Sequence, residues 1–312
     1  MKAVQYHRYG GSEVLSYTDV ERPSPGAGEV LVKVAGSSFN PVDAGIRGGY
    51  LTEVFAVRLP HVPGIDVAGT IAELGAGVTD WHVGDTVVAL LPMDADGAAA
   101  DYALAPAEAL AAAPQTVPLD DAAALPTVGL TAWQALFEIA ELTAGQTILI
   151  NGATGAVGGY AIQLAHEAGA VVTATSTPRH ARRLRERGAD HLIDYLGDVS
   201  AAIPGGPFDV VLNLVGTTEE QTDALIAAVT DGGIHVGTMT AGPENPGRGV
   251  RTQRVFVRSD AAQLADLVRR VDAGTLHVDV ADRRPLADAA AVHAASDEGR
   301  LPGKTILVPD AV

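Results

Sequence analysis

A glycine-rich segment over residues 151–159, with the sequence NGATGAVGG, constrains the fold of this chain more than any other feature. It follows the apolar run 147–150 and precedes the amphipathic run 160–168, so the sequence predicts a strand, a tight turn and a helix. In this setting Gly155 lets the backbone approach a pyrophosphate, and Gly158 lets the helix pack close to the strand. The free N–H groups at the start of the helix favour phosphate as a ligand.

One departure from the usual dinucleotide-binding pattern is Ala153, which stands where a first glycine is common. An ordinary strand–helix turn of another α/β domain is therefore the alternative interpretation. On the dinucleotide interpretation, we expect four consecutive residues of the turn and the first helical turn to contact the cofactor. They are Thr154, Gly155, Ala156 and Val157.

The segment after the next predicted strand bears on which dinucleotide binds. A site for NAD needs Asp or Glu at the end of that strand to hold the ribose 2′-hydroxyl, whereas this chain has Ser176, followed by Arg179. A hydroxyl and a cation suit a 2′-phosphate, which a carboxylate would repel, so we expect NADPH as the cofactor. The alternatives are that Ser176 caps the following helix and that Arg179 is an exposed surface residue.

The composition limits the partners and the chemistry. With 21 basic and 38 acidic residues the net charge is −17, which disfavours nucleic acid and anionic membranes as partners. Cysteine is absent, which excludes disulfides, thiolate zinc sites and a cysteine nucleophile. The sequence shows neither a signal-peptide pattern at its start nor an apolar run of membrane-spanning length, so we expect a cytoplasmic protein.

The spacing of apolar residues predicts two kinds of domain. Short alternating segments at 29–35, 67–74 and 84–90 predict strands of a partly open β-barrel. From about residue 120, strands and helices alternate, which is typical of a doubly wound parallel sheet. The predicted strands there are 147–150, 171–175, 191–193, 208–214, 233–237 and 252–257, and the predicted helices are 130–141, 157–167, 180–186, 221–229 and 260–273.

Several motifs, in order, resemble the medium-chain dehydrogenase/reductase superfamily, specifically its zinc-free quinone oxidoreductase branch. They run nearly from end to end: MKAV from residue 1, NPVD from 40, VPGIDVAG from 62, VGDTV from 83, TVGLTA from 127, the glycine-rich segment, FDVVLN from 208, VRSD from 257 and GK from 303. The resemblance implies an α/β chain in which a GroES-like, partly open β-barrel domain, 1–118 and 258–312, contains an inserted Rossmann domain, 119–257. It also implies an active site between the two.

The resemblance also implies that no zinc is used. Zinc-dependent members carry Cys at the position of Asn40 and Gly-His-Glu where this chain has Gly64-Ile65-Asp66. Ile65 cannot bind a metal, and Asn40 is a poor replacement for a thiolate. Asp66 alone is expected to bond backbone amides. Without a Lewis acid, we expect hydride delivery from NADPH to the β-carbon of a quinone or enone, because the carbonyl of such a substrate delocalises the incoming charge.

Asn40 and Tyr50 are the expected catalytic residues. The amide of Asn40 can orient the nicotinamide or the substrate, and the phenol of Tyr50, which resembles a tyrosine of the family's substrate pocket, can donate to a carbonyl oxygen. The alternatives are that Asn40 is a turn residue before a proline and that Tyr50 only covers the substrate, with water as the proton donor.

Further residues match positions that contact the cofactor in the family. Thr127 and Thr131 match a segment under the nicotinamide, Tyr195 a tyrosine near the 2′-phosphate, Asn213 and Gly216 the end of a central strand, and Gly237, Phe256 and Lys304 the nicotinamide half. Thr131 can instead satisfy a helix carbonyl, and Lys304 can instead form a surface ion pair.

The resemblance also implies an assembly and leaves other functions open. We expect a homodimer in which a Rossmann edge strand at 254–257 pairs with its two-fold mate. An enoyl or polyketide-pathway reductase of similar mechanism is the first alternative function. An NADPH-binding protein without turnover, serving as a structural or interaction partner, is the second.

Overall fold

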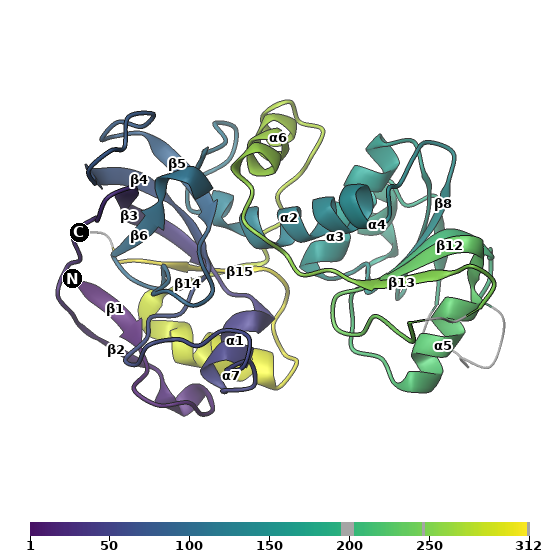
Figure 1. The fold of residues 1–312 in the computed structure, drawn as a ribbon, viewed down its shortest axis with the longest axis horizontal. Coiled ribbons are helices and arrows are strands. Elements are labelled where there is room, and N and C mark those ends of the chain that lie inside the picture. The colour runs from purple at the N-terminus through teal and green to yellow at the C-terminus, as the bar shows by residue number, and fades with distance from the viewer. Residues whose placement is uncertain (195–202, 245–246, 311–312) are drawn as a thin grey trace. The chain divides into compact units, whose positions relative to one another are not determined.

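The computed structural model describes residues 1–194, 203–244 and 247–310, and these residues form two compact units (Figure 1). Residues 1–127 and 259–312 make up the first unit, and residues 128–258 make up the second. The sequence analysis predicted the first domain boundary between residues 118 and 119. In the structure, residues 119–127 are grouped with the first unit. Within the described ranges, no helix combines the length and the apolar character needed to cross a membrane.

The first unit is built on a seven-stranded sheet, which is the β-rich domain that the sequence predicted. Its strands follow the order β14-β15-β3-β4-β5-β7, and β6 pairs with β3. Their bounds are β3 Glu29–Ser38, β4 Asp66–Leu74, β5 Thr86–Leu90, β6 Tyr102–Pro106, β7 Ala111–Ala112, β14 Asp282–Pro285 and β15 Thr305–Val308, and a separate antiparallel pair joins β1 Lys2–Gln5 to β2 Ser16–Asp19. Because β15 pairs with β3, the C-terminal segment completes a sheet that the N-terminal part begins.

Helices α1, Pro41–Arg47, and α7, Ala289–Asp297, also belong to the first unit, and the sequence analysis predicted neither. The buried Arg47 guanidinium joins them: its Nη1 lies 3.0 Å from His293 Nδ1, and its Nη2 donates to Asp297 Oδ2 at 2.8 Å. Burial, together with Arg47, lowers the pKa of His293 to about 3, so this imidazole is neutral and Nδ1 accepts from the arginine. The contact fixes α1 and therefore Asn40, which precedes its first residue.

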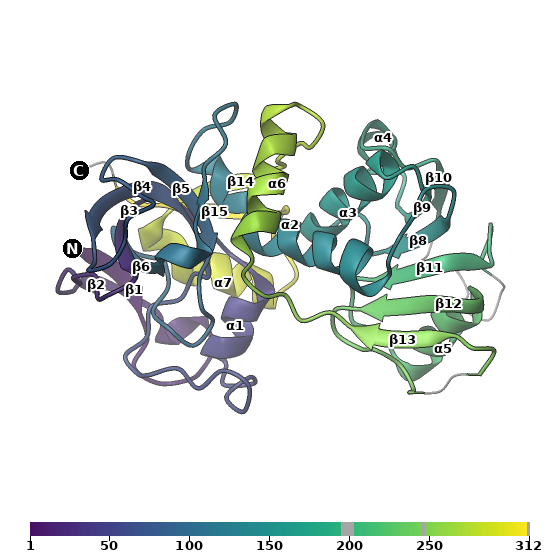
Figure 2. The ribbon, with the colours of Figure 1, turned by 45° about the horizontal axis from the view of Figure 1, so that its top comes forward.

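The second unit is the doubly wound parallel sheet that the sequence predicted (Figure 2). Its strand order is β10-β9-β8-β11-β12-β13. The bounds are β8 Thr147–Asn151, β9 Val171–Thr175, β10 His191–Ile193, β11 Phe208–Asn213, β12 Val229–Gly237 and β13 Arg251–Arg254, with helices α3 Ala156–Glu167, α4 Ala181–Glu186 and α5 Glu219–Ala227. The direction of winding reverses between β8 and β11, and ligands of such sheets bind at the C-terminal ends of the strands at this point.

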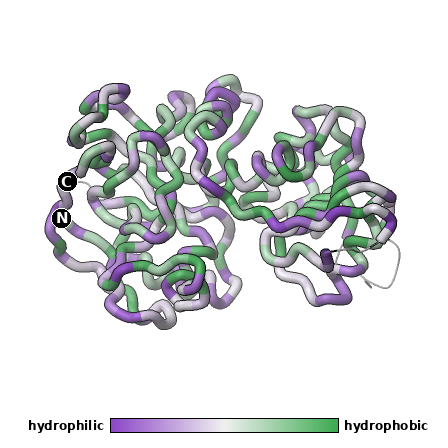
Figure 3. Tube along the Cα trace, in the orientation of Figure 1, coloured by the Kyte–Doolittle hydropathy of each residue, from purple (hydrophilic) through white to green (hydrophobic). Residues whose placement is uncertain are grey.

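Hydropathy along this sheet follows burial. The central strands β8 and β11 are mostly hydrophobic, whereas β13 at the edge is hydrophilic (Figure 3). Both faces of a central parallel strand are covered, which explains the continuous apolar runs. The predicted strand 252–257 lies at 251–254 instead, because β13 runs beside the end of β12 and leaves the sheet after Arg254. Of the apolar edge expected at 254–257, only Arg254 therefore belongs to a strand.

The predicted helix 130–141 differs from the structure in both its bounds and its regularity. Helix α2 spans Pro126–Trp133 and continues as a wider π-helical turn, Gln134–Ile139. The side chain of Gln134 donates from Nε2 to Arg258 O at 2.9 Å and accepts from Arg258 N at 3.1 Å. The π-helical turn therefore lies where the returning chain leaves the second unit. Helix α6, Ala261–Asp272, follows directly in the first unit.

Candidate active site

The glycine-rich loop joins β8 to α3, as the sequence predicted, and two of its glycines are required by the fold. Gly152 has a φ of +82°, and a Cβ on it would lie 2.7 Å from Val215 Cγ1. A Cβ on Gly158 would lie 2.6 Å from Ala153 Cα, so glycine here permits the close packing of helix on strand. Ala156 and Val157 form the first turn of α3, and Thr154 precedes the N-cap residue Gly155.

Gly155 and Gly216, by contrast, are not required by the fold. Gly155 has extended backbone angles, and the nearest atom to a Cβ there is Gly152 O at 3.4 Å. A Cβ on Gly216 would meet no atom within 4 Å. The two glycines follow β8 and β11, the strands on either side of the winding reversal. The residues present therefore fit a dinucleotide. Its pyrophosphate would take the space that a side chain would fill at these two glycine positions.

A buried polar layer lies beneath these loops, at the C-terminal ends of the central strands. Asn213 Oδ1 accepts from Asn151 Nδ2 at 2.9 Å, and Asn213 Nδ2 donates to Thr217 Oγ1 at 3.1 Å. Thr175 Oγ1 accepts from Gly152 N at 3.0 Å, which ties the end of β9 to the glycine-rich loop. The amide of Asn213 thus holds the loops together inside the protein. The sequence analysis missed Asn151 and Thr175, and their only signal is a polar residue at a strand end.

The segment after β9 contains the residues expected to recognise the 2′-phosphate. Ser176 Oγ donates to Thr177 O at 2.9 Å, and the cap residue of α4 is His180, so the alternative that Ser176 caps this helix is wrong. Arg179 is exposed. Arg183, which the sequence analysis missed, donates from Nη2 to Thr154 O at 2.7 Å. Burial lowers the pKa of His180, and the charges of Arg183 and Arg179 lower it further.

In the first unit, Asp66 is the centre of a buried polar cluster. Its Oδ1 accepts from the backbone N of Thr127 at 2.8 Å and from Thr127 Oγ1 at 2.7 Å. Its Oδ2 accepts from Asn40 Nδ2 at 2.9 Å and from Ser38 Oγ at 2.5 Å. Asp66 bonds a backbone amide, as predicted, but most of its partners are side chains.

Lys304 completes this cluster. Its Nζ donates to Asn40 Oδ1 at 2.7 Å, to Phe39 O at 3.3 Å and to Asp66 Oδ2 at 3.4 Å. The side chain is buried, so the alternative of a surface ion pair is wrong. Burial lowers the pKa of Lys304, and the nearby carboxylates oppose that effect. All three N–H groups of the ammonium have an acceptor, and the structure thereby brings together three predicted residues: Asn40, Thr127 and Lys304.

Asp43 adds a second buried carboxyl beside this cluster. It accepts from Asn40 N at 2.9 Å and from Gly64 N at 3.1 Å. Burial raises the pKa of Asp43 to about 6, and the charge of Asp66 acts in the same direction. The backbone of Asn40 is therefore fixed by Asp43, and its side chain is fixed by Asp66 and Lys304.

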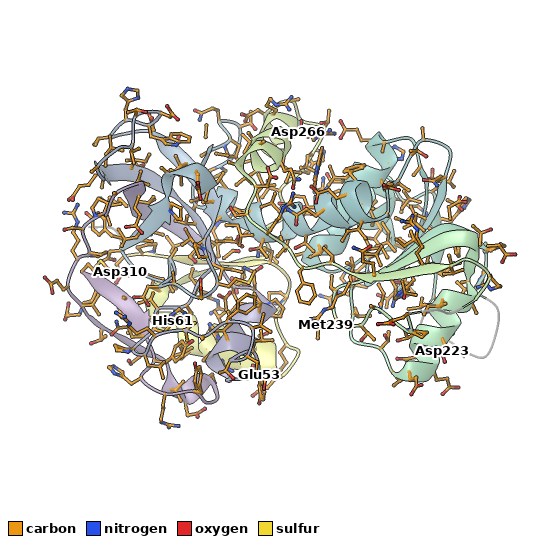
Figure 4. The ribbon with its side chains drawn as sticks, viewed as in Figure 1. Glu53, His61, Asp223, Met239, Asp266 and Asp310 are labelled. Carbon is orange, nitrogen blue, oxygen red and sulfur yellow. The ribbon has the colours of Figure 1, made fainter. Side chains whose placement is uncertain are left out.

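The other predicted site residues lie outside the two polar clusters described above. Tyr50, in the turn after α1, is 86% exposed, and the nearby Glu53 projects outward (Figure 4). Phe256 is 62% exposed with the Arg254 guanidinium 4.4 Å from its ring centroid. Thr131 is buried in α2. Gly237 ends β12, where a Cβ would lie 1.9 Å from Thr240 O, so the following turn, which leads past the exposed Met239, requires glycine. Tyr195 lies outside the described residues.

Potential metal ligands do not gather anywhere in the described part of the chain. Across residues 1–194, 203–244 and 247–310, no group of three or more His, Cys, Asp or Glu side chains could hold a metal ion.

Known proteins resemble this chain over its whole length. Residues 26–115 match the family model of the alcohol dehydrogenase GroES-like domain, and residues 187–307 match that of the zinc-binding dehydrogenases. The chain is 33% identical to the chloroplast envelope quinone oxidoreductase homolog of Arabidopsis thaliana, covering 99% of this chain and 98% of that protein. It is 33% identical to the 2-methylene-furan-3-one reductase of Solanum lycopersicum, covering 99% and 79%. The structure of the quinone oxidoreductase from Coxiella burnetii superposes with a TM-score of 0.91 at 30% identity, covering 99% of both chains.

Proposed function

Because the chain belongs to the medium-chain dehydrogenase/reductase superfamily, in its quinone oxidoreductase branch, we propose that it reduces a quinone or an α,β-unsaturated ketone with NADPH and without a metal. That the chain is an NAD(P)H-dependent oxidoreductase follows from its relatives. The choice of NADPH, the substrate class and the absence of zinc are parts of the proposal. A cytoplasmic location stays a prediction, since the Arabidopsis relative is named for the chloroplast envelope.

The Lys304 ammonium is the observation that carries the metal-free part of the proposal. Zinc-dependent members bear ligands at and near the positions of Asn40 and Asp66, and here both side chains are bonded to Lys304 Nζ, at 2.7 and 3.4 Å. A divalent cation bound to the same oxygens would stand beside a buried ammonium, and the two like charges would repel strongly. This arrangement supports a reaction that does not use a Lewis acid at this position.

For hydride transfer, the protein mainly has to hold the cofactor and the substrate in the right orientation. When bound, NADPH supplies the hydride, and the substrate carbonyl delocalises the resulting negative charge. The first unit holds the Asn40 amide in one orientation, because both its oxygen and its nitrogen are hydrogen-bonded inside the cluster. We therefore propose that Asn40 helps to position the nicotinamide or the substrate. The phenol of Tyr50, which is exposed, supports a role as donor to the substrate oxygen.

Tyr50→Phe tests that role. If the phenol donates to the developing enolate-like oxygen, kcat should fall by roughly 10–100-fold, the loss expected for one hydrogen bond to a charged oxygen, while the Kd for NADPH changes little. Steady-state kinetics and cofactor titration measure the two quantities separately. An unchanged kcat would make Tyr50 a covering residue, with water as the proton donor.

A homodimer is a further part of the proposal. Strand β13 lies at one edge of the six-stranded sheet, so one side of its backbone has no partner strand within the described residues. Pairing of β13 with its mate in a second copy would satisfy those groups. The hydrophilic side chains of β13 predict that backbone pairing, more than apolar burial, would hold the dimer. Multi-angle light scattering at micromolar concentration should give twice the chain mass, and a monomer mass would refute the dimer.

The experiment that tests the proposed function is a substrate panel. NADPH oxidation would be followed with quinones, enones, enoyl thioesters and saturated ketones, using protein dialysed against a strong chelator. We expect turnover of quinones or enones and none of saturated ketones. Turnover of enoyl thioesters alone would favour the biosynthetic alternative. NADPH binding without turnover of any compound would favour a binding protein.

A further inference from the structure

The segment that follows β9 is the most basic part of an acidic chain. Five arginines and one glutamate lie between residues 179 and 187, whereas the whole chain has a net charge of −17. NADPH carries several negative charges, so the field of the whole protein opposes its approach. An NADPH site on this acidic chain therefore needs a local cluster of cations. The contacts of the individual arginines indicate which of them binds the cofactor.

Arg183 differs from its neighbours in its contacts. It is half-buried, and its Nη2 donates to Thr154 O at 2.7 Å, which ties helix α4 to the glycine-rich loop. Arg182, one residue earlier, has a side chain that is 91% exposed and lies 4.0 Å from Glu186 on the same helix. The two arginines carry the same charge, but only Arg183 reaches the loop.

Among the described residues, no neighbouring acid neutralises the charge of Arg183. Its bond to Thr154 O is to an uncharged carbonyl, and across the part of the chain that the structure describes no carboxylate lies within ion-pair distance of it. Burial lowers the pKa of His180 most, and the charges of Arg183 and Arg179 lower it further, so both guanidinium groups act on the start of α4. A guanidinium held by one nitrogen keeps further N–H groups for an anion.

We propose that Arg183 binds the 2′-phosphate of NADPH and is the main residue that distinguishes it from NADH. The adenosine ribose in such sheets lies between the glycine-rich loop and the end of the second strand of the βαβ unit, which here is β9, ending before Ser176. An arginine that spans from α4 to Thr154 crosses this position. The proposal rests on the proposed NADPH dependence and adds the residue that determines it.

The test compares two arginine variants against four ligands. Adenosine 2′,5′-bisphosphate carries the 2′-phosphate without the pyrophosphate, and 5′-AMP is its matched control, as NADH is for NADPH. By isothermal titration, Arg183→Gln should weaken NADPH and adenosine 2′,5′-bisphosphate by roughly 10–100-fold, the loss typical of a charge-assisted hydrogen bond. It should change NADH and 5′-AMP by less than about threefold. Arg182→Gln removes the same charge from the same helix and should change all four only slightly.

Each other outcome has a definite meaning. Equal losses for NADPH and NADH would show that Arg183 serves the pyrophosphate loop, and unchanged NADPH affinity would show that it contacts neither; both results overturn the proposal. Equal affinities of the unaltered protein for NADPH and NADH would instead overturn the NADPH dependence itself. Phenylglyoxal labelling of the unaltered protein needs no variant: adenosine 2′,5′-bisphosphate, but not 5′-AMP, should protect Arg183 from modification. Equal labelling with both ligands would contradict the proposal.

Discussion

Replacing Lys304 by methionine is expected to lower the free energy of unfolding by about 3–5 kcal/mol, the range for removing one partner of a buried ion pair. The change would leave Asp66 buried without its cation and Asn40 Oδ1 without its donor. Urea denaturation measures the loss. Lys2→Met is the matched control, because Lys2 pairs with Asp19 at 2.7 Å on the surface, and it should cost much less.

The pH dependence of this loss identifies its cause. Lys304 lowers the pKa of Asp43, so removing the ammonium should raise the pKa of Asp43 further above its unfolded value. A carboxyl with a raised folded pKa loses stability as pH rises through that pKa. The difference between Lys304→Met and the unaltered protein should therefore be larger at pH 8 than at pH 5. Adding Asp66→Asn should recover part of the loss at pH 8, and a pH-independent difference would contradict the electrostatic explanation.

Alanine at Gly155 and at Gly158 should separate cofactor binding from stability. At Gly155 the nearest atom to the new Cβ is 3.4 Å away, so Gly155→Ala should leave the melting temperature nearly unchanged. Its Cβ would enter the space assigned to the pyrophosphate, and we expect NADPH to bind at least roughly 10-fold more weakly, equivalent to about 1.4 kcal/mol. Gly158→Ala places a Cβ 2.6 Å from Ala153 Cα and should cost about 1–3 kcal/mol of stability through overpacking.

Calorimetric melting and cofactor titration of both variants provide the comparison. Each glycine is the control for the other, since the added group is the same methyl in the same glycine-rich segment. Strong NADPH binding by Gly155→Ala would mean that this glycine does not face the cofactor. A large stability loss in that variant would mean that the fold requires it after all.

Local pattern was sufficient to predict the parallel sheet of the second unit, although not the bounds of its first helix and its edge strand. The apolar runs of β8 and β11 have covered faces in the structure, and the positions of α3 and α5 followed from the 3.6-residue period. The first unit was harder to predict in detail. Helix α1 is short, and a buried arginine that bonds α7, 246 residues away along the chain, holds it in place. Such contacts have no local signal, so neither helix was predicted.

For the site, as for the fold, local motifs indicated the residues, but the contacts between residues far apart in the sequence could not be predicted. Family motifs placed Asn40, Thr127 and Lys304 in one set, and the structure brings them together around Asp66. No spacing could show that the ammonium bonds Asn40, because the two residues are 264 positions apart. Arg183 was missed for a different reason: in a run of arginines it looks like its neighbours, and only the folded helix brings one of them to the glycine-rich loop.

The fate of the hydride tests the central claim most directly. NADPH with deuterium at C4 of the nicotinamide, on the face that the enzyme uses, would be incubated in ordinary water with a reactive enone and chelator-treated protein. NMR of the product should show deuterium at the β-carbon and hydrogen from solvent at the α-carbon. Transfer to the carbonyl carbon, or turnover that returns only when zinc is added, would contradict metal-free conjugate reduction.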